Sequence, residues 1–153
     1  MKYMILVYAS QRDYDAMVGK PVSGEPGWSG ADFAALGQFM EQFARDLAET
    51  GELVDTRGLT APSQARRIRL ADGAPMVTDG PYAEAEEVLA GYWIVECDNL
   101  DRATGIASRL SSAPGPEHIR ARAYADVRPL AESRHELDGL CARAGDQHRG
   151  PAA

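Results

Sequence analysis

Four carboxylates lie within nine consecutive residues, and their type and spacing suit proton transfer better than any other group in the chain. The stretch runs from Asp79 to Glu87 and reads DGPYAEAEE. A carboxyl group held in a half-buried pocket has a raised pKa and can act as a proton shuttle on an enolisable substrate. Asp79 and Glu84 are therefore the candidate catalytic residues.

The same stretch also has an explanation without chemistry. Asp79 can accept bonds from backbone N–H groups, Gly80 relieves steric limits and Pro81 fixes φ, which together make a turn. The glutamates suit the solvated first turn of a helix, because the helix dipole favours acidic groups there. Both interpretations remain open. A metal site is not expected, because no histidine or further oxygen ligand accompanies the glutamates.

Two arginines and a tyrosine lie on the last expected strand, residues 119–127. Alternation along a strand places Arg120, Arg122 and Tyr124 on one face and leaves small apolar residues for the face that packs on helices. A guanidinium group there either binds a ligand carboxylate or pairs with a carboxylate of the protein, and both remain open. The full predicted ligand-binding set is Tyr8, Tyr82, Tyr92, Arg120, Arg122 and Tyr124.

Two long helices are expected to position these residues. Ser29 followed by Asp32 marks the start of the first, on which apolar residues recur at helical spacing until Gly51 ends it. Asp98 is the expected cap of the second helix, which ends before Pro114. Each helix has one apolar face, so each must pack against a sheet or another helix.

Six strands are expected from runs of β-branched and aromatic residues. Asp72-Gly73 indicates a hairpin turn between two of them. A loop with a helical turn follows the first strand, and its Tyr14 and Trp28 are candidates to close over a ligand. The expected strands are residues 3–8, 53–59, 66–70, 74–78, 88–97 and 119–127.

This order of elements predicts a split β-α-β arrangement with an added hairpin, in which two helices cover one face of an antiparallel sheet. Residues 3–8 are apolar throughout, so both faces of this strand need a cover. The simplest cover for the second face is another copy of the chain across a two-fold axis. We therefore expect a homodimer whose facing sheets enclose a pocket for a small molecule.

Composition and charge limit the classes of function. A chain of 153 residues with 44% hydrophobic residues can form one core, expected over residues 1–130 with an extension over 131–153. The formal net charge of -7 disfavours nucleic-acid binding, and the apolar start is too short for a signal peptide or a membrane span. Cys97 and Cys141 indicate neither a disulfide scaffold nor a zinc site, which fits a reducing cytoplasm.

The stretch from Asp79 to Glu87 is similar to a family signature, D-G-P-F-x-E-x-K-E. Tyr82 replaces the phenylalanine of that signature, and Glu86 replaces its lysine. Other matching positions are Met1-Lys2-Tyr3-Met4, Gly51, Gly58-Leu59, Gly91-Tyr92, Leu100-Asp101-Arg102-Ala103 and Asp126-Val127-Arg128-Pro129. On these residues, which span 1–130, the chain resembles the YCII-related, or DGPF-domain, proteins.

The resemblance implies a ferredoxin-like α+β fold that forms a dimeric α/β barrel. A few members of the family look like small cofactor-free enzymes, and we expect no cofactor. Related proteins are thought to pair a histidine near the first loop with an aspartate as general acid and base. The histidines of this chain are His118, His135 and His148, so only Asp79 matches that pair. The family also tends to be encoded near genes for extracytoplasmic-function sigma factors.

Two functions from different classes remain. The first is a small-molecule-binding homodimer without catalysis, which senses a ligand or acts with a sigma factor. The second is a cofactor-free isomerase, dehydratase or cyclase for a small acidic enolisable compound, with Asp79 or Glu84 as base and Arg120 or Arg122 as anion clamp. An unpaired carboxylate near an arginine in an open pocket favours the enzyme, and paired charges favour binding.

Overall fold

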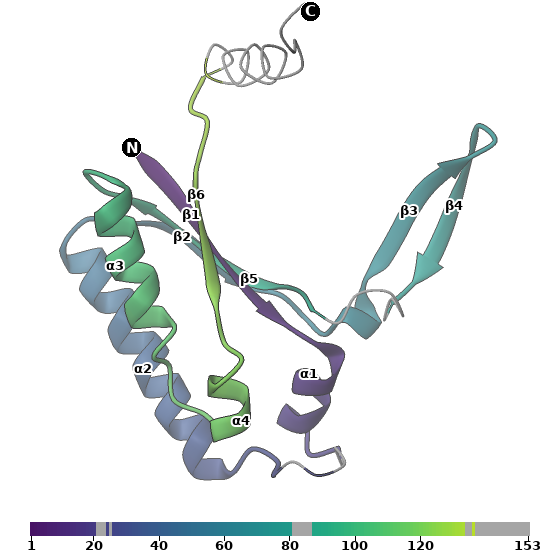
Figure 1. The fold of residues 1–153 in the computed structure, drawn as a ribbon, viewed down its shortest axis with the longest axis horizontal. Coiled ribbons are helices and arrows are strands. Elements are labelled where there is room, and N and C mark those ends of the chain that lie inside the picture. The colour runs from purple at the N-terminus through teal and green to yellow at the C-terminus, as the bar shows by residue number, and fades with distance from the viewer. Residues whose placement is uncertain (21–23, 25, 81–86, 134–135, 137–153) are drawn as a thin grey trace, which may run out of the picture.

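A mixed α/β fold with an antiparallel sheet is seen in the computed structural model, which describes residues 1–20, 24, 26–80, 87–133 and 136 (Figure 1). The strands are β1 (Lys2–Ala9), β2 (Leu53–Gly58), β3 (Arg66–Ala71), β4 (Ala74–Asp79), β5 (Val88–Glu96) and β6 (Ala125–Pro129). The helices are α1 (Gln11–Met17), α2 (Gly30–Glu49), α3 (Leu100–Leu110) and α4 (Glu117–Arg120), with a 3-10 turn, η1, at Pro62–Gln64.

The main sheet has four strands in the order β2-β5-β1-β6, and every neighbouring pair is antiparallel. This order is consistent with the expected ferredoxin-like arrangement. The described strands form an open sheet and not a closed barrel. β1 and β5 are the central strands, and their register places Ile5 opposite Trp93 and Tyr3 opposite Val95. These four buried side chains share one face of the sheet.

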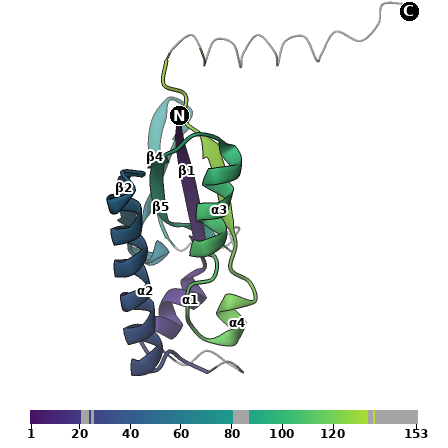
Figure 2. The same ribbon diagram turned by 90° about the vertical axis from the view of Figure 1, so that its left-hand side faces the viewer.

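The core lies between that face and two helices, as Figure 2 shows from the helix side. Phe43 and Leu47 of α2 are buried there, and the Phe43 ring meets Trp93 edge to face at 4.8 Å between centroids. From α3, Ala103, Ile106, Ala107 and Leu110 are buried at the spacing expected from the sequence. The apolar periodicity therefore predicted both helix faces correctly.

The opposite face of the sheet is not covered by any described helix. Because Tyr3 and Ile5 point into the core, strand alternation places Met4 and Leu6 on this second face, opposite Ile94 and Tyr92. All four side chains are half-buried in the single chain. We call these four residues the open face.

Both long helices begin at side-chain caps. Ser29 and Asp32 form a reciprocal capping box at the start of α2, as expected. Gly51, at a φ of 73°, lies just beyond the end of that helix. The cap of α3 is Asn99 and not the expected Asp98, because the Asn99 side chain accepts from the Arg102 backbone N–H.

β3 and β4 form a separate two-stranded hairpin that projects from the body (Figure 1), and we call residues 66–79 the arm. Its tight turn is at Asp72 and Gly73, which both have positive φ, as the sequence predicts. Ile68 and Val77 face each other across the arm and are 69% and 56% exposed. No described part of the same chain covers them.

The expected strand over residues 119–127 is wrong in its first half. Residues 117–120 form the short helix α4, and β6 begins only at Ala125. Pro116 is the N-cap of α4, and Glu117 and Arg120 within this short helix are favourable helix formers. Arg120 and Arg122 are therefore not on a strand, and the expected alternation of their side chains between the two faces of a sheet does not occur. The proposed extension, residues 131–153, lies mostly outside the described residues.

Within the described part of the chain, no helix is long and apolar enough to span a bilayer.

Candidate functional site

A cavity of about 490 Å³ lies on the helix-covered side of the sheet. Strands β1, β2, β5 and β6 form one wall, and α2, α4 and the segment joining α3 to α4 form the others. Its volume is within the range of small-molecule pockets, roughly 300–1,000 Å³. The cavity thus belongs to one chain, whereas the sequence suggested a chamber between two facing sheets. That second chamber stays a prediction.

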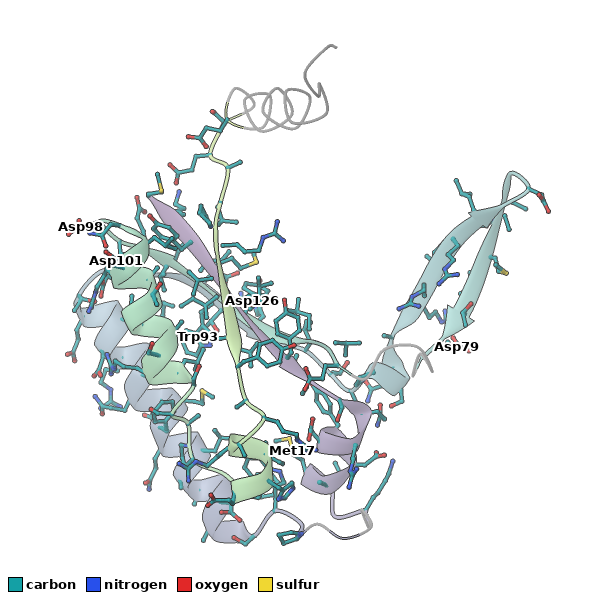
Figure 3. All side chains as sticks on the ribbon, viewed as in Figure 1. Met17, Asp79, Trp93, Asp98, Asp101 and Asp126 are labelled. Atoms are coloured by element: carbon teal, nitrogen blue, oxygen red, sulfur yellow. The ribbon has the colours of Figure 1, made fainter. Side chains whose placement is uncertain are left out.

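Aromatic and aliphatic side chains form most of the cavity wall. Both tryptophans of the chain, Trp28 and Trp93, line it, together with Leu36 and Met40 of α2. Trp28 lies in the loop before α2, and its ring packs against Phe33 at 5.1 Å between centroids. In Figure 3, Trp93 lies between the sheet and the helices. The site is therefore shaped for rings and hydrocarbon surface.

Gly115 is the residue that makes room for the Trp28 ring. A Cβ placed on Gly115 would lie 3.0 Å from the outer edge of that ring. Gly115 stands between Pro114 and Pro116 in the segment from α3 to α4, and all three residues are at least half-buried. Pro114 and Gly115 of this segment line the cavity.

Charge in the cavity wall comes from arginine alone among the described residues. Arg57 and Arg120 line the cavity, and no described aspartate, glutamate or histidine does. Arg57 is already engaged, because its guanidinium lies 2.7 Å from Asp55 and donates to the Thr56 carbonyl at 2.6 Å. The Arg120 guanidinium makes no hydrogen bond or ion pair within the described part of the chain.

Two stacked tyrosines, Tyr8 and Tyr124, also line the cavity, with ring centroids 5.2 Å apart and planes 17° from parallel. Burial and a hydrogen bond to Asp126 raise the pKa of the Tyr8 phenol. A hydrogen bond to Glu87, followed by burial, raises the pKa of the Tyr124 phenol. Both phenols are therefore neutral near pH 7, where each is a hydrogen-bond donor and not a base.

Glu87 links the sequence signature to the cavity. It is the last residue of the stretch from Asp79 to Glu87, and its carboxylate acts on the Tyr124 phenol and raises the pKa of that phenol. The sequence indicated no partner for Glu87, because Tyr124 is 37 residues away along the chain. The signature therefore contributes at least one carboxylate to the tyrosine pair.

Of the two predicted catalytic carboxylates, only Asp79 lies within the described residues, and it does not line the cavity. Asp79 ends β4 on the arm, where its carboxylate pairs with Arg66 at 3.3 Å and its side chain is 80% exposed (Figure 3). Glu84 and the predicted ligand contact Tyr82 lie outside the described residues. In the described structure Asp79 therefore takes part in an exposed ion pair with Arg66 and does not line the cavity.

The predicted ligand-binding residues separate into two groups. Tyr8, Arg120 and Tyr124 line the cavity. Arg122 instead pairs with Asp13 of α1 at 3.0 Å. Tyr92 lies on the open face and donates to Asp55 at 2.9 Å. Only the first group can contact a molecule in this cavity.

Of the two aromatic residues expected to close over a ligand, one lines the cavity. Trp28 does so, whereas Tyr14 lies on α1 and donates to the Leu59 carbonyl at 2.8 Å. Sequence reasoning missed Leu36 and Met40 as wall residues, because helical periodicity shows which face is buried but not what that face contacts.

No group of three or more His, Cys, Asp or Glu side chains arranged to hold a metal ion occurs among the described residues.

Comparison with known proteins identifies two similarities. Residues 1–128 match the sequence model of the YCII-related domain. The chain is also similar to an uncharacterized protein of Rhizobium meliloti (strain 1021), with 32% identity over 104 residues that cover 68% of this chain and 80% of that protein.

Proposed function

Because the chain belongs to the YCII-related domain family, we propose that it is a homodimeric small-molecule-binding protein whose binding site is the cavity between the sheet and the helices. The observation that carries this proposal is the cavity wall, which combines two tryptophans with the guanidinium of Arg120, for which the described residues supply no partner. Mostly apolar pockets with a few polar groups are the usual form of small-molecule sites. An apolar wall and one guanidinium are sufficient for a protein that binds a ligand and does not transform it.

The same wall favours binding over proton-transfer catalysis. A cofactor-free isomerase or dehydratase needs a base within hydrogen-bond reach of its substrate. The described wall contains no carboxylate or histidine, and the raised pKa values of Tyr8 and Tyr124 keep both phenols protonated. Asp79, the base inferred from the signature, lies on the arm. The enzymatic alternative therefore has weaker support.

The binding proposal is tested by filling the cavity. An uncharged ring compound, 1-naphthalenemethanol, is expected to raise the melting temperature of the protein in proportion to its occupancy. Ala113→Phe places a ring in the wall and should abolish this shift. Ala48→Phe, an exposed position on α2 outside the wall, is the matched control and should keep it. An equal shift in both variants would place binding elsewhere.

A second copy of the chain is the proposed cover for the open face. Met4, Leu6, Tyr92 and Ile94 present a mostly apolar surface on the two central strands. Antiparallel sheets usually bury one face and expose a polar one, so this composition supports burial of the second face as well. Two such sheets facing each other across a two-fold axis would form the dimeric α/β barrel that the family resemblance implies.

The dimer is tested by a charge on the open face. Leu6→Glu should convert the protein to a folded monomer, because two carboxylates would then be buried near the two-fold axis without partners. Leu100→Glu, at the exposed start of α3, should leave the oligomeric state unchanged. Sedimentation velocity measures both, and circular dichroism checks the fold. A wild-type monomer at micromolar concentration would refute this part of the proposal.

A further inference from the structure

We propose that the ligand of the cavity is a flat, ring-containing compound with one acidic group, and that Arg120 binds this group. The inference rests on the proposed function, because it assigns a chemical class to the ligand of the same cavity. It depends on three observations: the aromatic wall, the sign of the charge in the wall, and the lack of a partner for Arg120 among the described residues.

The ring part of the ligand follows from the shape of the wall. Trp28 and Trp93 both line the cavity and come from different parts of the fold, one from the loop before α2 and the other from β5. Aromatic faces pack best against other flat ring systems. The remaining wall is largely aliphatic, with Leu36, Met40 and Ile119 among its members. A strongly hydrated, flexible ligand would leave this surface without matching contacts.

The acidic group follows from the charge of the wall. The whole chain has a formal net charge of -7, yet the described cavity residues include two arginines and no carboxylate. Two described carboxylates, Asp126 and Glu87, act on the phenols of Tyr8 and Tyr124 but do not line the cavity themselves. The charged side chains of the described wall are thus arginines, which favour an acidic ligand over a cationic one. The Arg57 guanidinium is neutralised by Asp55, so the remaining positive charge is that of Arg120.

Arg120 is suited to hold the acidic group of a ligand whose rings lie deeper in the cavity. It is the last residue of α4 and is exposed, while Ile119 beside it is half-buried. A guanidinium can donate two parallel hydrogen bonds to one carboxylate or sulfonate. Within the described wall, Arg120 is the one guanidinium without a described partner, and it matches one acidic group, so we infer a monoacid.

The test compares three compounds that share a ring system and differ in charge: 1-naphthoate, 1-naphthalenemethanol and 1-naphthylmethylammonium. Both tryptophans line the cavity, so the two indole N–H signals in a nitrogen-proton correlation spectrum report binding directly. We expect naphthoate to bind about tenfold more tightly than the alcohol, a factor worth about 1.4 kcal/mol, and the ammonium compound to bind most weakly.

Arg120→Gln should remove this preference and leave the affinity for the alcohol unchanged, which also shows that the variant is folded. Arg120→Lys keeps the positive charge but loses the pair of parallel N–H donors, and should retain part of the preference for naphthoate. Arg69→Gln removes an exposed arginine from the arm and is the matched control, which should bind like the wild type.

The possible results separate the two proposals. Equal affinities for naphthoate and the alcohol, or a preference for naphthoate that survives in Arg120→Gln, would overturn the acidic-ligand inference and leave the binding site intact. If none of the three compounds moves either indole signal, the proposed binding function fails as well.

Discussion

Gly91 of β5 lies opposite Gly58 of β2 in the sheet. It is buried, and a Cβ at this position would lie 2.8 Å from the backbone oxygen of Arg57, a contact that neither strand can relieve without moving. A side chain here would therefore push apart two hydrogen-bonded strands that also form one wall of the cavity.

Gly91→Ala should lower the free energy of unfolding by about 1–3 kcal/mol, the usual cost of overpacking. Gly37→Ala is the matched control, because Gly37 lies within α2 with open space around its Cβ position. That change should raise the free energy of unfolding by about 0.5–1 kcal/mol, through helix propensity alone. Urea unfolding measures both, and two changes of the same sign would contradict the explanation.

Glu52 makes the stability of the fold depend on pH. Its carboxylate accepts two hydrogen bonds from the Arg102 guanidinium at 2.7 Å each, which lowers the pKa of Glu52 below its usual 4.5. Because the folded pKa lies below the unfolded one, this stabilisation is fully present above pH 4.5 and is lost as the pH falls through the folded pKa.

Glu52→Gln should therefore remove part of the loss of stability seen on acidification below pH 4.5. The measurement is the free energy of unfolding in urea at several pH values between 3 and 7. The wild type should lose more stability than the variant across the acidic part of this range. Parallel curves would show that the ion pair contributes nothing in the folded state.

Some individual contacts could be predicted from the sequence and others could not. Ser29 and Asp32 are three residues apart, so their capping box is a local pattern that sequence reasoning identifies. The pairing of Arg122 with Asp13 joins residues 109 positions apart and depends on where α1 lies beside the segment after α4. Such a contact follows from the three-dimensional arrangement and has no signal in the sequence.

At the scale of elements, the arm is the part of the fold with the weakest internal support. A two-stranded hairpin is marginally stable in water, and all the described side chains of β4 are exposed. The central strand β1, in contrast, is hydrogen-bonded on both sides and contributes two side chains to the core.

The backbone amides of the arm should therefore exchange with deuterium faster than those of β1. Hydrogen-exchange mass spectrometry at neutral pH compares peptides from residues 66–79 with those from residues 2–9. A protected arm would indicate that another chain covers its exposed Ile68 and Val77 side chains.

The segment after α3 shows why alternation alone is a weak signal. Arg120, Arg122 and Tyr124 alternate with small residues, which fits a strand, but alanine and arginine are also favourable in helices. The Pro114-Gly115-Pro116 segment is a stronger signal for the structure that follows, because it allows the chain to turn and α4 to start at Glu117. By contrast, the hairpin turn at Asp72-Gly73 had one clear interpretation and was predicted correctly.

At the scale of the whole molecule, the order of the strands and of the two long helices, and the helix-covered sheet, followed from periodicity and turn residues. The position of the cavity did not follow. The cavity forms where four strands, α2 and the segment that includes α4 meet. Its volume depends on how closely the side chains of these elements pack against one another. The sequence suggested cavity residues such as Tyr8 and Trp28, but it could not show that they share one wall.

The arm is inserted between β2 and β5 in the sequence, so a cut in the arm divides the chain into two pieces that each hold two strands of the sheet. Arg69 is exposed on the arm, so trypsin should be able to cut there. One fragment would then carry β1 and β2, and the other β5 and β6. Every ladder of the four-stranded sheet joins a strand of one fragment to a strand of the other. The nicked protein should thus migrate as a single folded species and separate into two pieces only in denaturant, which makes the arm a natural position for splitting the polypeptide into complementing halves.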